Sequence, residues 1–162
     1  MLKQYIEVEN YLIKNDIIAN IDEYSKKVPE KKVKFIKKQI EDKNSPFNAY
    51  LSNIIESNNI NELENIGHIL NMSGFKLSFK VQTLNTDNID IIKTYIKYSD
   101  HKTCSNKVKL IKTIINCEDE DGIDILLESN FITNKNLDKF INFAINSGKY
   151  KIVPKLMERK KL

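Results

Sequence analysis

The sequence predicts an all-α protein, a short α-solenoid of roughly five stacked antiparallel helix pairs in one domain over residues 1–162. First, 4 Gly and 3 Pro in 162 residues are too few for a turn-rich β-sandwich or barrel. Second, apolar residues recur at helical spacing along most of the chain. Third, these stretches come in pairs whose second members start at 60, 89, 123 and 150, which are 29, 34 and 27 residues apart. One pair cannot bury its own apolar face, so neighbouring pairs must stack.

Residues 1–45 form the predicted N-terminal cap, which diverges from the pairs that follow. Apolar stripes predict helices over residues 5–12 and 17–24, with a turn at Asn15-Asp16 between them. A third helix is expected over residues 29–43, with Pro29 in its first turn, where the missing N–H costs little. The apolar stripe of this helix is narrow, and lysines occupy much of the rest of its surface.

Residues 46–162 contain the predicted stacked pairs. The first pair begins with Ser45 as the N-cap and Pro46 at the first helical position, and we expect Ser105 and Thr133 to cap two later helices. The expected helices span residues 47–56, 60–72, 75–84, 89–98, 108–115, 123–128, 137–145 and 150–157. The stretch 75–84 is the least regular of these, because its apolar residues alternate and would also suit a strand.

The last pair, residues 136–159, has the clearest pattern. Gly148 lies between its two helices and suits the left-handed turn that often follows a helix end. The runs Phe143-Ala144, Ser147-Gly148, Lys151-Ile152-Val153 and Leu156-Met157 resemble the inner-helix end, glycine turn and outer helix of an ankyrin repeat. Residues 90–96 and 124–129 are similar to the outer helix of the same family. The resemblance extends over the C-terminal half to two thirds of the chain.

The chain also departs from the ankyrin pattern. The Thr-Pro-Leu-His opening of that family is absent from every unit, and the hairpin between units is missing or shortened. The intervals between units also depart from the usual period of about 33 residues. An unclassified α-solenoid or a compact helical domain therefore stays open as the alternative architecture.

The charge of the chain is positive but consists almost entirely of lysine. The net charge is +4, and Arg159 is the one arginine in the sequence. Abundant Lys, Ile and Asn with so little Arg is typical of an AT-rich coding sequence, so we interpret most lysines as a solvated surface. Arginine supplies the planar fork that reads phosphate and guanine, which makes a specialised nucleic-acid binder the less favoured function. The alternative would use the basic segment 26–38, with phosphate contacts from Lys31, Lys32, Lys34, Lys37 and Lys38.

No recognisable catalytic or metal-binding pattern occurs in the sequence. His68 and His101 have no metal ligand at the required spacing, and the acidic run 118–121 does not fit a calcium-binding loop. We expect that run to complement the positive end of the helix that follows it. Cys104 and Cys117 are expected to be partly buried structural residues, because the acidic neighbours of Cys117 would disfavour a reactive thiolate. We therefore expect no enzyme activity, no cofactor and no metal site.

The expected function is binding to another protein, and the partner surface follows from the ankyrin resemblance. That resemblance implies a surface formed by inner helices and the loops between units. The candidate contact residues are Lys109, Lys112, Asn116, Lys139, Asn142 and Asn146. Irregular repeats without catalytic groups would also suit a virus- or phage-encoded inhibitor that occludes a cellular protein. The sequence has neither a signal-peptide core nor a membrane-spanning apolar run, so we expect a cytoplasmic location in the producing or host cell and no membrane partner.

Overall fold

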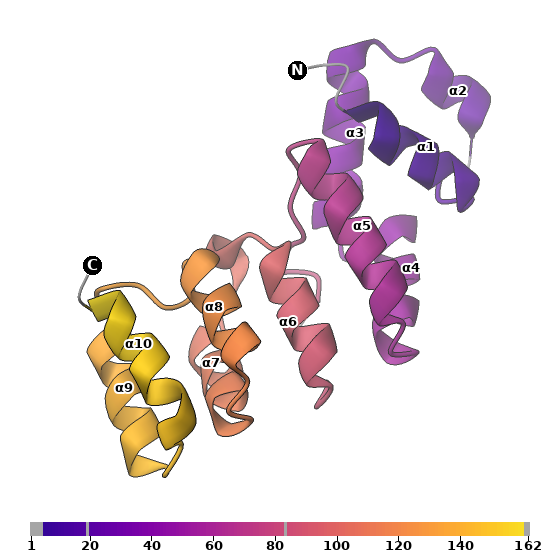
Figure 1. Ribbon diagram of the computed structural model, residues 1–162. Helices are drawn as coiled ribbons and strands as arrows, with labels where there is room; N and C mark the ends of the chain where they lie inside the picture. Colours follow the sequence, from indigo (N-terminus) through magenta and orange to yellow (C-terminus); the bar gives the residue numbers. More distant parts are fainter. Residues whose placement is uncertain (1–4, 19, 83, 161–162) are drawn as a thin grey trace.

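The computed structural model describes residues 5–18, 20–82 and 84–160, and in these residues the chain is helical with no strands (Figure 1). This confirms the all-α prediction. The described residues form ten α-helices and two short 3-10 helices. In chain order they are α1 (Ile6–Lys14), α2 (Ile21–Ser25), α3 (Pro29–Glu41), α4 (Pro46–Glu56), α5 (Ile60–Met72), α6 (Ile89–Lys97), η2 (His101–Thr103), α7 (Lys107–Asn116), α8 (Glu120–Glu128), α9 (Leu137–Asn146), η3 (Tyr150–Ile152) and α10 (Val153–Lys160).

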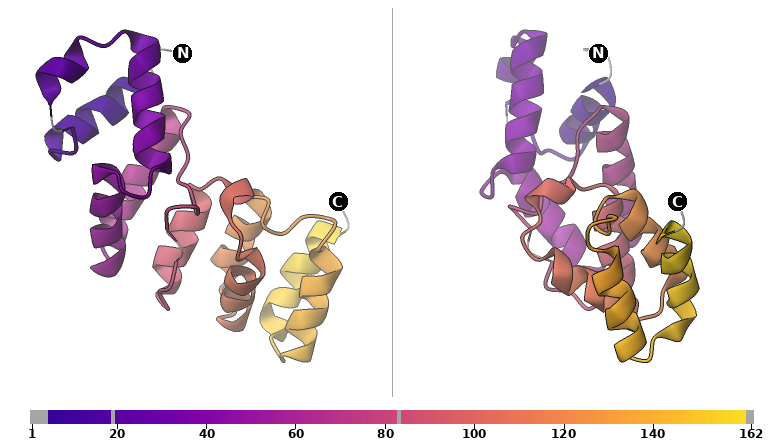
Figure 2. Two further views of the ribbon diagram at one scale, coloured as in Figure 1. Left: turned by 180° about the vertical axis from the view of Figure 1, so that it is seen from behind. Right: turned by 90° about the vertical axis from the view of Figure 1, so that its left-hand side faces the viewer.

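Helices that follow one another in the sequence pack side by side over most of the chain. The pairs α4 with α5, α7 with α8 and α9 with α10 are in contact. Helix α6 packs between α5 and α8, and α8 packs in turn against α10, so these four helices succeed one another along the molecule (Figures 1 and 2). Helix α7 also contacts α9. One continuous apolar cluster runs through the stack, from Tyr5 in the N-terminal part to Leu156 in α10.

The predicted helix over residues 75–84 is wrong, because this segment is extended or turned wherever it is described. Leu77 pairs with Ser99 in a parallel bridge: the Leu77 N–H donates to the Tyr98 carbonyl at 2.8 Å, and its own carbonyl accepts from the Asp100 N–H at 2.8 Å. Leu77, Ser78 and Phe79 are all buried and the lysines on either side of them are exposed, so the alternation noted in the sequence is broken at Ser78. Helix α6 packs against this segment, through Tyr95, as well as against the helices α5 and α8.

The N-terminal part has three helices, and the second is shorter than predicted. Ile17 and Ile18 are buried but precede the helix, which begins only after Asn20. The Asn20 side chain accepts a hydrogen bond from the Glu23 N–H at 3.0 Å and so fixes the start of α2. Helix α1 contacts α5, and α3 contacts α4, which joins this part to the rest of the stack.

The helix ends confirm some of the predicted caps and correct others. Ser45 caps α4 by accepting from the Asn48 N–H at 3.1 Å, with Pro46 at the start of the helix, and Gly148 has a φ of 71°. Ser105 and Thr133 are not the caps that we expected. The residues before α7 and α9 are Asn106 and Asn136, and neither donates or accepts a side-chain cap bond. The Asn136 side chain instead accepts from the Thr133 N–H and donates to the Phe131 carbonyl, which stabilises the turn before α9.

Candidate functional site

The six residues expected to contact a partner lie at matching positions of α7 and α9. Lys109, Lys112 and Asn116 are each thirty residues before Lys139, Asn142 and Asn146. Each set follows i, i+3, i+7 spacing, so its members share one face of their helix. The buried residues of the two helices lie on the other side; they are Leu110, Ile111, Ile114 and Ile115 of α7, and Leu137, Phe140, Ile141 and Ala144 of α9. Lys112 is half-buried and the other five are exposed.

These six residues form what we call the α7–α9 strip, and apolar groups accompany them. The Lys112 ammonium on α7 lies 4.8 Å from the centre of the Phe143 ring on α9, so the strip bridges the two helices. Phe143 is half-buried, and Val108 at the start of α7 is 40% exposed. The strip thus offers lysines and amides next to accessible apolar surface, a combination that suits contact with another protein.

The basic helix α3 contains one structural lysine and four exposed ones. Lys32 is half-buried, with its ammonium 3.6 Å from a Glu9 carboxylate oxygen of α1 and 5.2 Å from the centre of the Tyr24 ring of α2. Lys32 therefore holds the three N-terminal helices together. The exposed lysines form no ion pair within the described part of the chain; they are Lys31, Lys34, Lys37 and Lys38.

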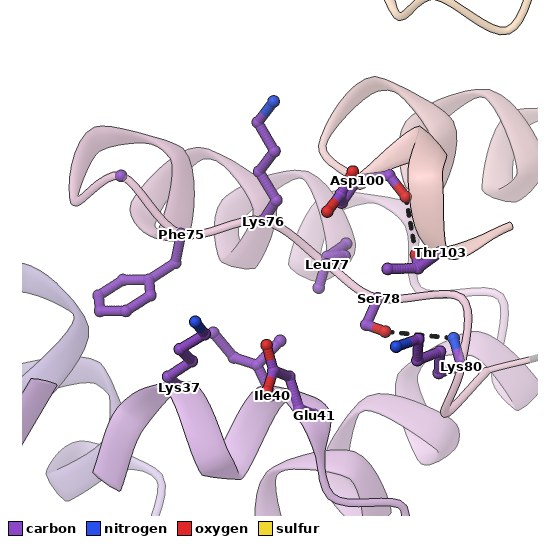
Figure 3. A pocket seen from close by; sticks show the side chains of 11 residues that line it. Lys37, Ile40, Glu41, Phe75, Lys76, Leu77, Ser78, Lys80, Asp100 and Thr103 are labelled. Carbon is purple, nitrogen blue, oxygen red and sulfur yellow. Dashed lines mark hydrogen bonds between the residues drawn. The ribbon is translucent and has the colours of Figure 1, made fainter. Parts of the chain in front are cut away.

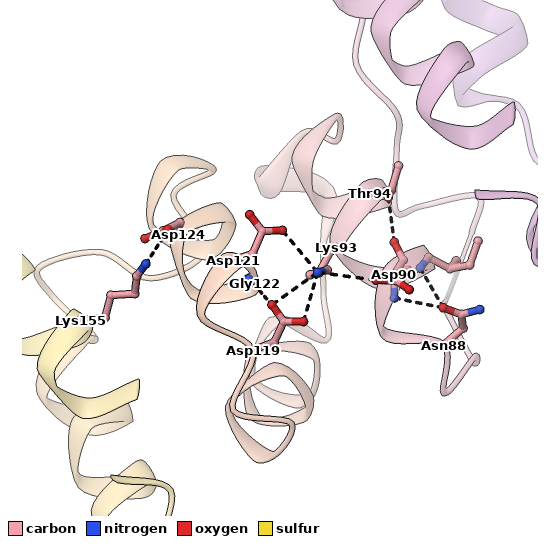
Figure 4. A network of polar contacts seen from close by, with 10 residues as sticks. Asn88, Asp90, Lys93, Thr94, Asp119, Asp121, Gly122, Asp124 and Lys155 are labelled. Atoms are coloured by element: carbon pink, nitrogen blue, oxygen red, sulfur yellow. Dashed lines mark hydrogen bonds and ion pairs between the residues drawn. The ribbon is translucent and has the colours of Figure 1, made fainter. Parts of the chain in front are cut away.

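The acidic run before α8 is part of an ion-pair network that joins neighbouring helices (Figure 4). Asp119 caps α8 by accepting from the Gly122 N–H at 2.8 Å, and Glu120 and Asp121 lie in the first turn, as expected for a helix N-terminus. The Lys93 ammonium of α6 lies 3.1 Å from Asp119 and 3.3 Å from Asp121, which ties α6 to α8. Burial disfavours ionisation of Asp119, but the Gly122 N–H and the Lys93 ammonium outweigh it and lower the pKa of this carboxyl.

Two further ion pairs connect helices that are neighbours in the stack. The Lys97 ammonium of α6 lies 3.1 Å from Glu64 of α5, and the Lys155 ammonium of α10 lies 2.8 Å from Asp124 of α8. Together with Lys93, these pairs link α5, α6, α8 and α10 in order. Each of the carboxylates Asp119, Asp121, Glu64 and Asp124 thus has a lysine partner in this network.

The histidines and cysteines do not assemble into a site. His68 is exposed on α5, whereas the His101 Nδ1 lies 3.2 Å from the Lys107 ammonium. Burial lowers the pKa of His101, and the charge of Lys107 lowers it further. Cys104 is buried, and this burial raises the pKa of its thiol; Cys117 is exposed, so our expectation of burial is wrong there. Across residues 5–18, 20–82 and 84–160, no cluster of three or more His, Cys, Asp or Glu residues could hold a metal ion.

Sequence reasoning missed one group of residues that the fold brings together. Lys37 of α3 lies beside the extended segment that contains Lys76 and Lys80, and the three lysines line a common cleft (Figure 3). The alternating pattern of residues 75–81 was the one signal in the sequence that pointed to an extended segment there.

In the described ranges, no helix has both the length and the apolar character needed to cross a membrane. Comparisons of the chain with protein-family models, with curated proteins and with solved structures found no match.

Proposed function

We propose that this chain is a non-enzymatic protein-binding module, an ankyrin-like array of stacked helix pairs in which the α7–α9 strip contacts another protein. The order of packing supports the array, because α5, α6, α8 and α10 follow one another and α7 lies against α9. Each new helix buries its apolar face on its neighbour, as stacked repeats do. The extended segment before α6 makes the array irregular without interrupting it.

The observation that carries the proposal is the strip itself. Its six polar residues repeat between two adjacent helices, and five of them are exposed. No ion pair within the described chain involves Lys109, Lys112 or Lys139. Two of these ammonium groups contact aromatic rings, Lys112 at Phe143 and Lys139 at Phe140, but none of the described carboxylates pairs with any of the three, so they are available to a partner whose surface is acidic. Long-range attraction would steer that partner, and Val108 and Phe143 would supply apolar contact.

The proposal is tested by affinity capture from a lysate of the native source. The triple variant Lys109→Glu, Lys112→Glu and Lys139→Glu reverses the charge of the strip. The control variant Lys14→Glu, Lys26→Glu and Lys43→Glu changes the net charge equally at exposed sites in the N-terminal part. We expect the wild type and the control to retain the same stoichiometric protein, and the strip variant to lose it while its helical signal and melting temperature persist. Equal retention by all three proteins would contradict the proposal.

A second candidate function, nucleic-acid binding through α3, is favoured by the four exposed lysines of that helix. Variants should neutralise Lys31, Lys34, Lys37 and Lys38 but keep Lys32, because Lys32 holds α3 against α1 and α2. Binding through α3 would weaken steeply as salt rises and would disappear in the quadruple glutamine variant. Retention of a partner after nuclease treatment would count against this function and in favour of the first.

A further inference from the structure

A cleft of about 530 Å³ lies between the C-terminal end of α3 and the extended segment that precedes α6 (Figure 3). Helix α3 contributes Lys37, Ile40 and Glu41 to its lining, and the segment contributes residues 74–78 and Lys80. The turn that follows α6 closes the cleft with Asp100 and Thr103. Residues far apart in the sequence thus form its two walls.

The cleft exists because residues 75–82 are not helical. An α-helix with its side chains is about 10 Å across, whereas a single extended chain is much thinner and leaves space beside it. The segment is also held in place from one side. The Thr103 hydroxyl accepts from the Phe79 N–H at 2.9 Å and donates to the Asp100 carbonyl at 2.7 Å, and Leu77 pairs with Ser99. The wall is therefore formed before any ligand binds, which lowers the entropic cost of binding.

The lining combines apolar and cationic groups. Ile40 and Leu77 are buried at the base, and Phe75 is half-buried and points toward α3. The Lys37 side chain extends from α3 toward Phe75, and Lys80 lies beside Ser78, whereas Lys76 points to the opposite side of the segment (Figure 3). Lys37, Lys76 and Lys80 are exposed, and none of them forms an ion pair with another described residue.

The surroundings of the segment carry an excess of positive charge. The lining contains three lysines and two carboxylates, Glu41 and Asp100, and one of the lysines, Lys76, points away from the other side chains (Figure 3). Asp100 is already engaged, because its carboxylate accepts from the Lys102 N–H at 3.0 Å. On the Lys76 side, burial lowers the pKa of His101; Lys107, Lys102 and Lys76 lower it further, against the opposing charge of Asp100. An approaching carboxylate would therefore be attracted to either side of the segment.

We propose that this cleft binds an acidic peptide segment, with an apolar side chain of the peptide between Ile40 and Phe75 and its carboxylates at Lys37 and Lys80. The inference rests on the proposed function in one respect, that the ligand is part of a protein, but it uses a surface separate from the α7–α9 strip. A peptide fits the lining better than a nucleic acid does. The apolar base can hold an apolar side chain of a peptide but offers nothing to a phosphodiester. A peptide can also donate its backbone N–H groups to the carboxylates of Glu41 and Asp100, which a phosphodiester cannot do.

The test is an NMR titration of the full-length ¹⁵N-labelled chain with two pools of synthetic peptides of about eight residues. One pool combines Asp and Glu with Leu and Phe at random, and the other replaces the acids by Asn and Gln. A thymidine oligonucleotide is titrated separately. We expect the acidic pool to shift amide signals of residues 37–41, 74–80 and 100–103 in a saturable way. The amide pool and the oligonucleotide should leave these signals unchanged.

Matched variants locate the binding site. The double variant Lys37→Gln and Lys80→Gln should bind the acidic pool about tenfold more weakly or worse, because two charge-assisted contacts are lost. The control variant Lys31→Gln and Lys34→Gln removes the same charge from exposed positions of α3 outside the cleft and should bind as the wild type does. All four lysines are exposed, so each variant should keep the wild-type melting temperature.

Several results would overturn this inference. They are the absence of shifts with the acidic pool, equal shifts with the amide pool, shifts with the oligonucleotide alone, or equal weakening by the control variant. The strip variant Lys109→Glu, Lys112→Glu and Lys139→Glu separates the two proposals, because it should leave peptide binding in the cleft unchanged. If that variant lost partner capture and the wild type bound no acidic peptide, the cleft proposal would be refuted while the proposed function remained supported.

Discussion

Replacement of Gly67 by alanine should destabilise this protein, although the change improves helix propensity. Gly67 lies in the middle of α5, where alanine would by itself raise the free energy of unfolding by about 1 kcal/mol. A Cβ at this position, however, would lie 2.2 Å from Cδ2 and 2.4 Å from Cγ of the Tyr98 ring. These distances are far below van der Waals contact, so either the ring or the helix must move.

The ring of Tyr98 has little freedom to move away. Its hydroxyl donates a hydrogen bond to the Glu64 carboxylate of α5, and the Lys97 ammonium lies 5.0 Å from its ring centre. Overpacking of a well-filled core typically costs about 1–3 kcal/mol, and displacement of the ring would also weaken its hydrogen bond to a charged group. Against the gain in propensity, we expect Gly67→Ala to lower the free energy of unfolding by about 2 kcal/mol. For a chain of this length, that corresponds to a melting temperature lower by about 4–8 °C.

The assay is urea denaturation followed by circular dichroism, as a double-mutant cycle with Tyr98→Ala. In the Tyr98→Ala background the clash is absent, so Gly67→Ala should become neutral or stabilising by up to about 1 kcal/mol. The reasoning would be refuted if Gly67→Ala stabilised the wild type, or if its effect were equal in both backgrounds.

Three further predictions test other parts of the structure. Lys93→Met removes the ammonium that ties α6 to α8 and should cost about 1 kcal/mol in urea denaturation, whereas Lys97→Met, at a half-exposed pair, should cost less. The pKa of Asp119 is lowered in the folded protein, so this carboxylate stabilises the fold above the ordinary aspartate pKa of about 3.9, and the stabilisation is lost as the pH falls through the lowered pKa. The variant Asp119→Asn lacks this titrating group, so its melting temperature should fall less steeply at acid pH than that of the wild type. Gly148→Ala should lower the free energy of unfolding by about 1 kcal/mol, because the φ of 71° at this position is unfavourable for alanine. Asparagine adopts such a φ more readily, so Gly148→Asn should cost less. No atom lies within 4 Å of an added Cβ, so an equal loss of stability in both variants would argue against backbone strain as the cause.

The helices that sequence reasoning predicted best are those with one wide apolar stripe. Residues 137–145 and 60–72 were expected to be helical, and α9 and α5 match them closely. Some helix boundaries could also be predicted from local chemistry, such as the start of α4 at Ser45-Pro46 and the glycine turn at Gly148 after α9. Such features can be predicted because the interactions that produce them lie within a few residues of one another.

The errors arose where distant parts of the chain decide the structure. Leu77 is extended because it pairs with Ser99, twenty-two residues later, and no local pattern contains that partner. The helices expected after Ser105 and Thr133 begin instead after Asn106 and Asn136, neither of which makes a side-chain cap bond, so cap chemistry did not decide where these helices start. The exposure of Cys117 likewise depends on how α7 and α8 meet.

The candidate sites also differ in how far they depend on residues that are distant in the sequence. The α7–α9 strip could be predicted, because i, i+3, i+7 spacing places polar residues on one helix face without knowledge of the neighbours. The exposed lysines of α3 could be predicted as a basic surface, but the structural role of Lys32 depends on Glu9 and Tyr24 in other helices. The cleft could not be predicted, because it requires Lys37 and Lys80 to meet across two elements that are remote in the sequence.

The central structural claim is that the stack of helices continues past an extended segment before α6, where a helix would otherwise be expected. Backbone chemical shifts and nuclear Overhauser contacts of the labelled protein test this directly. We predict extended shifts for residues 75–78, contacts between Leu77 and Ser99, and protection of the Leu77 amide from hydrogen exchange. Helical shifts through this segment, with no contact between Leu77 and Ser99, would contradict the account and remove the cleft that depends on it.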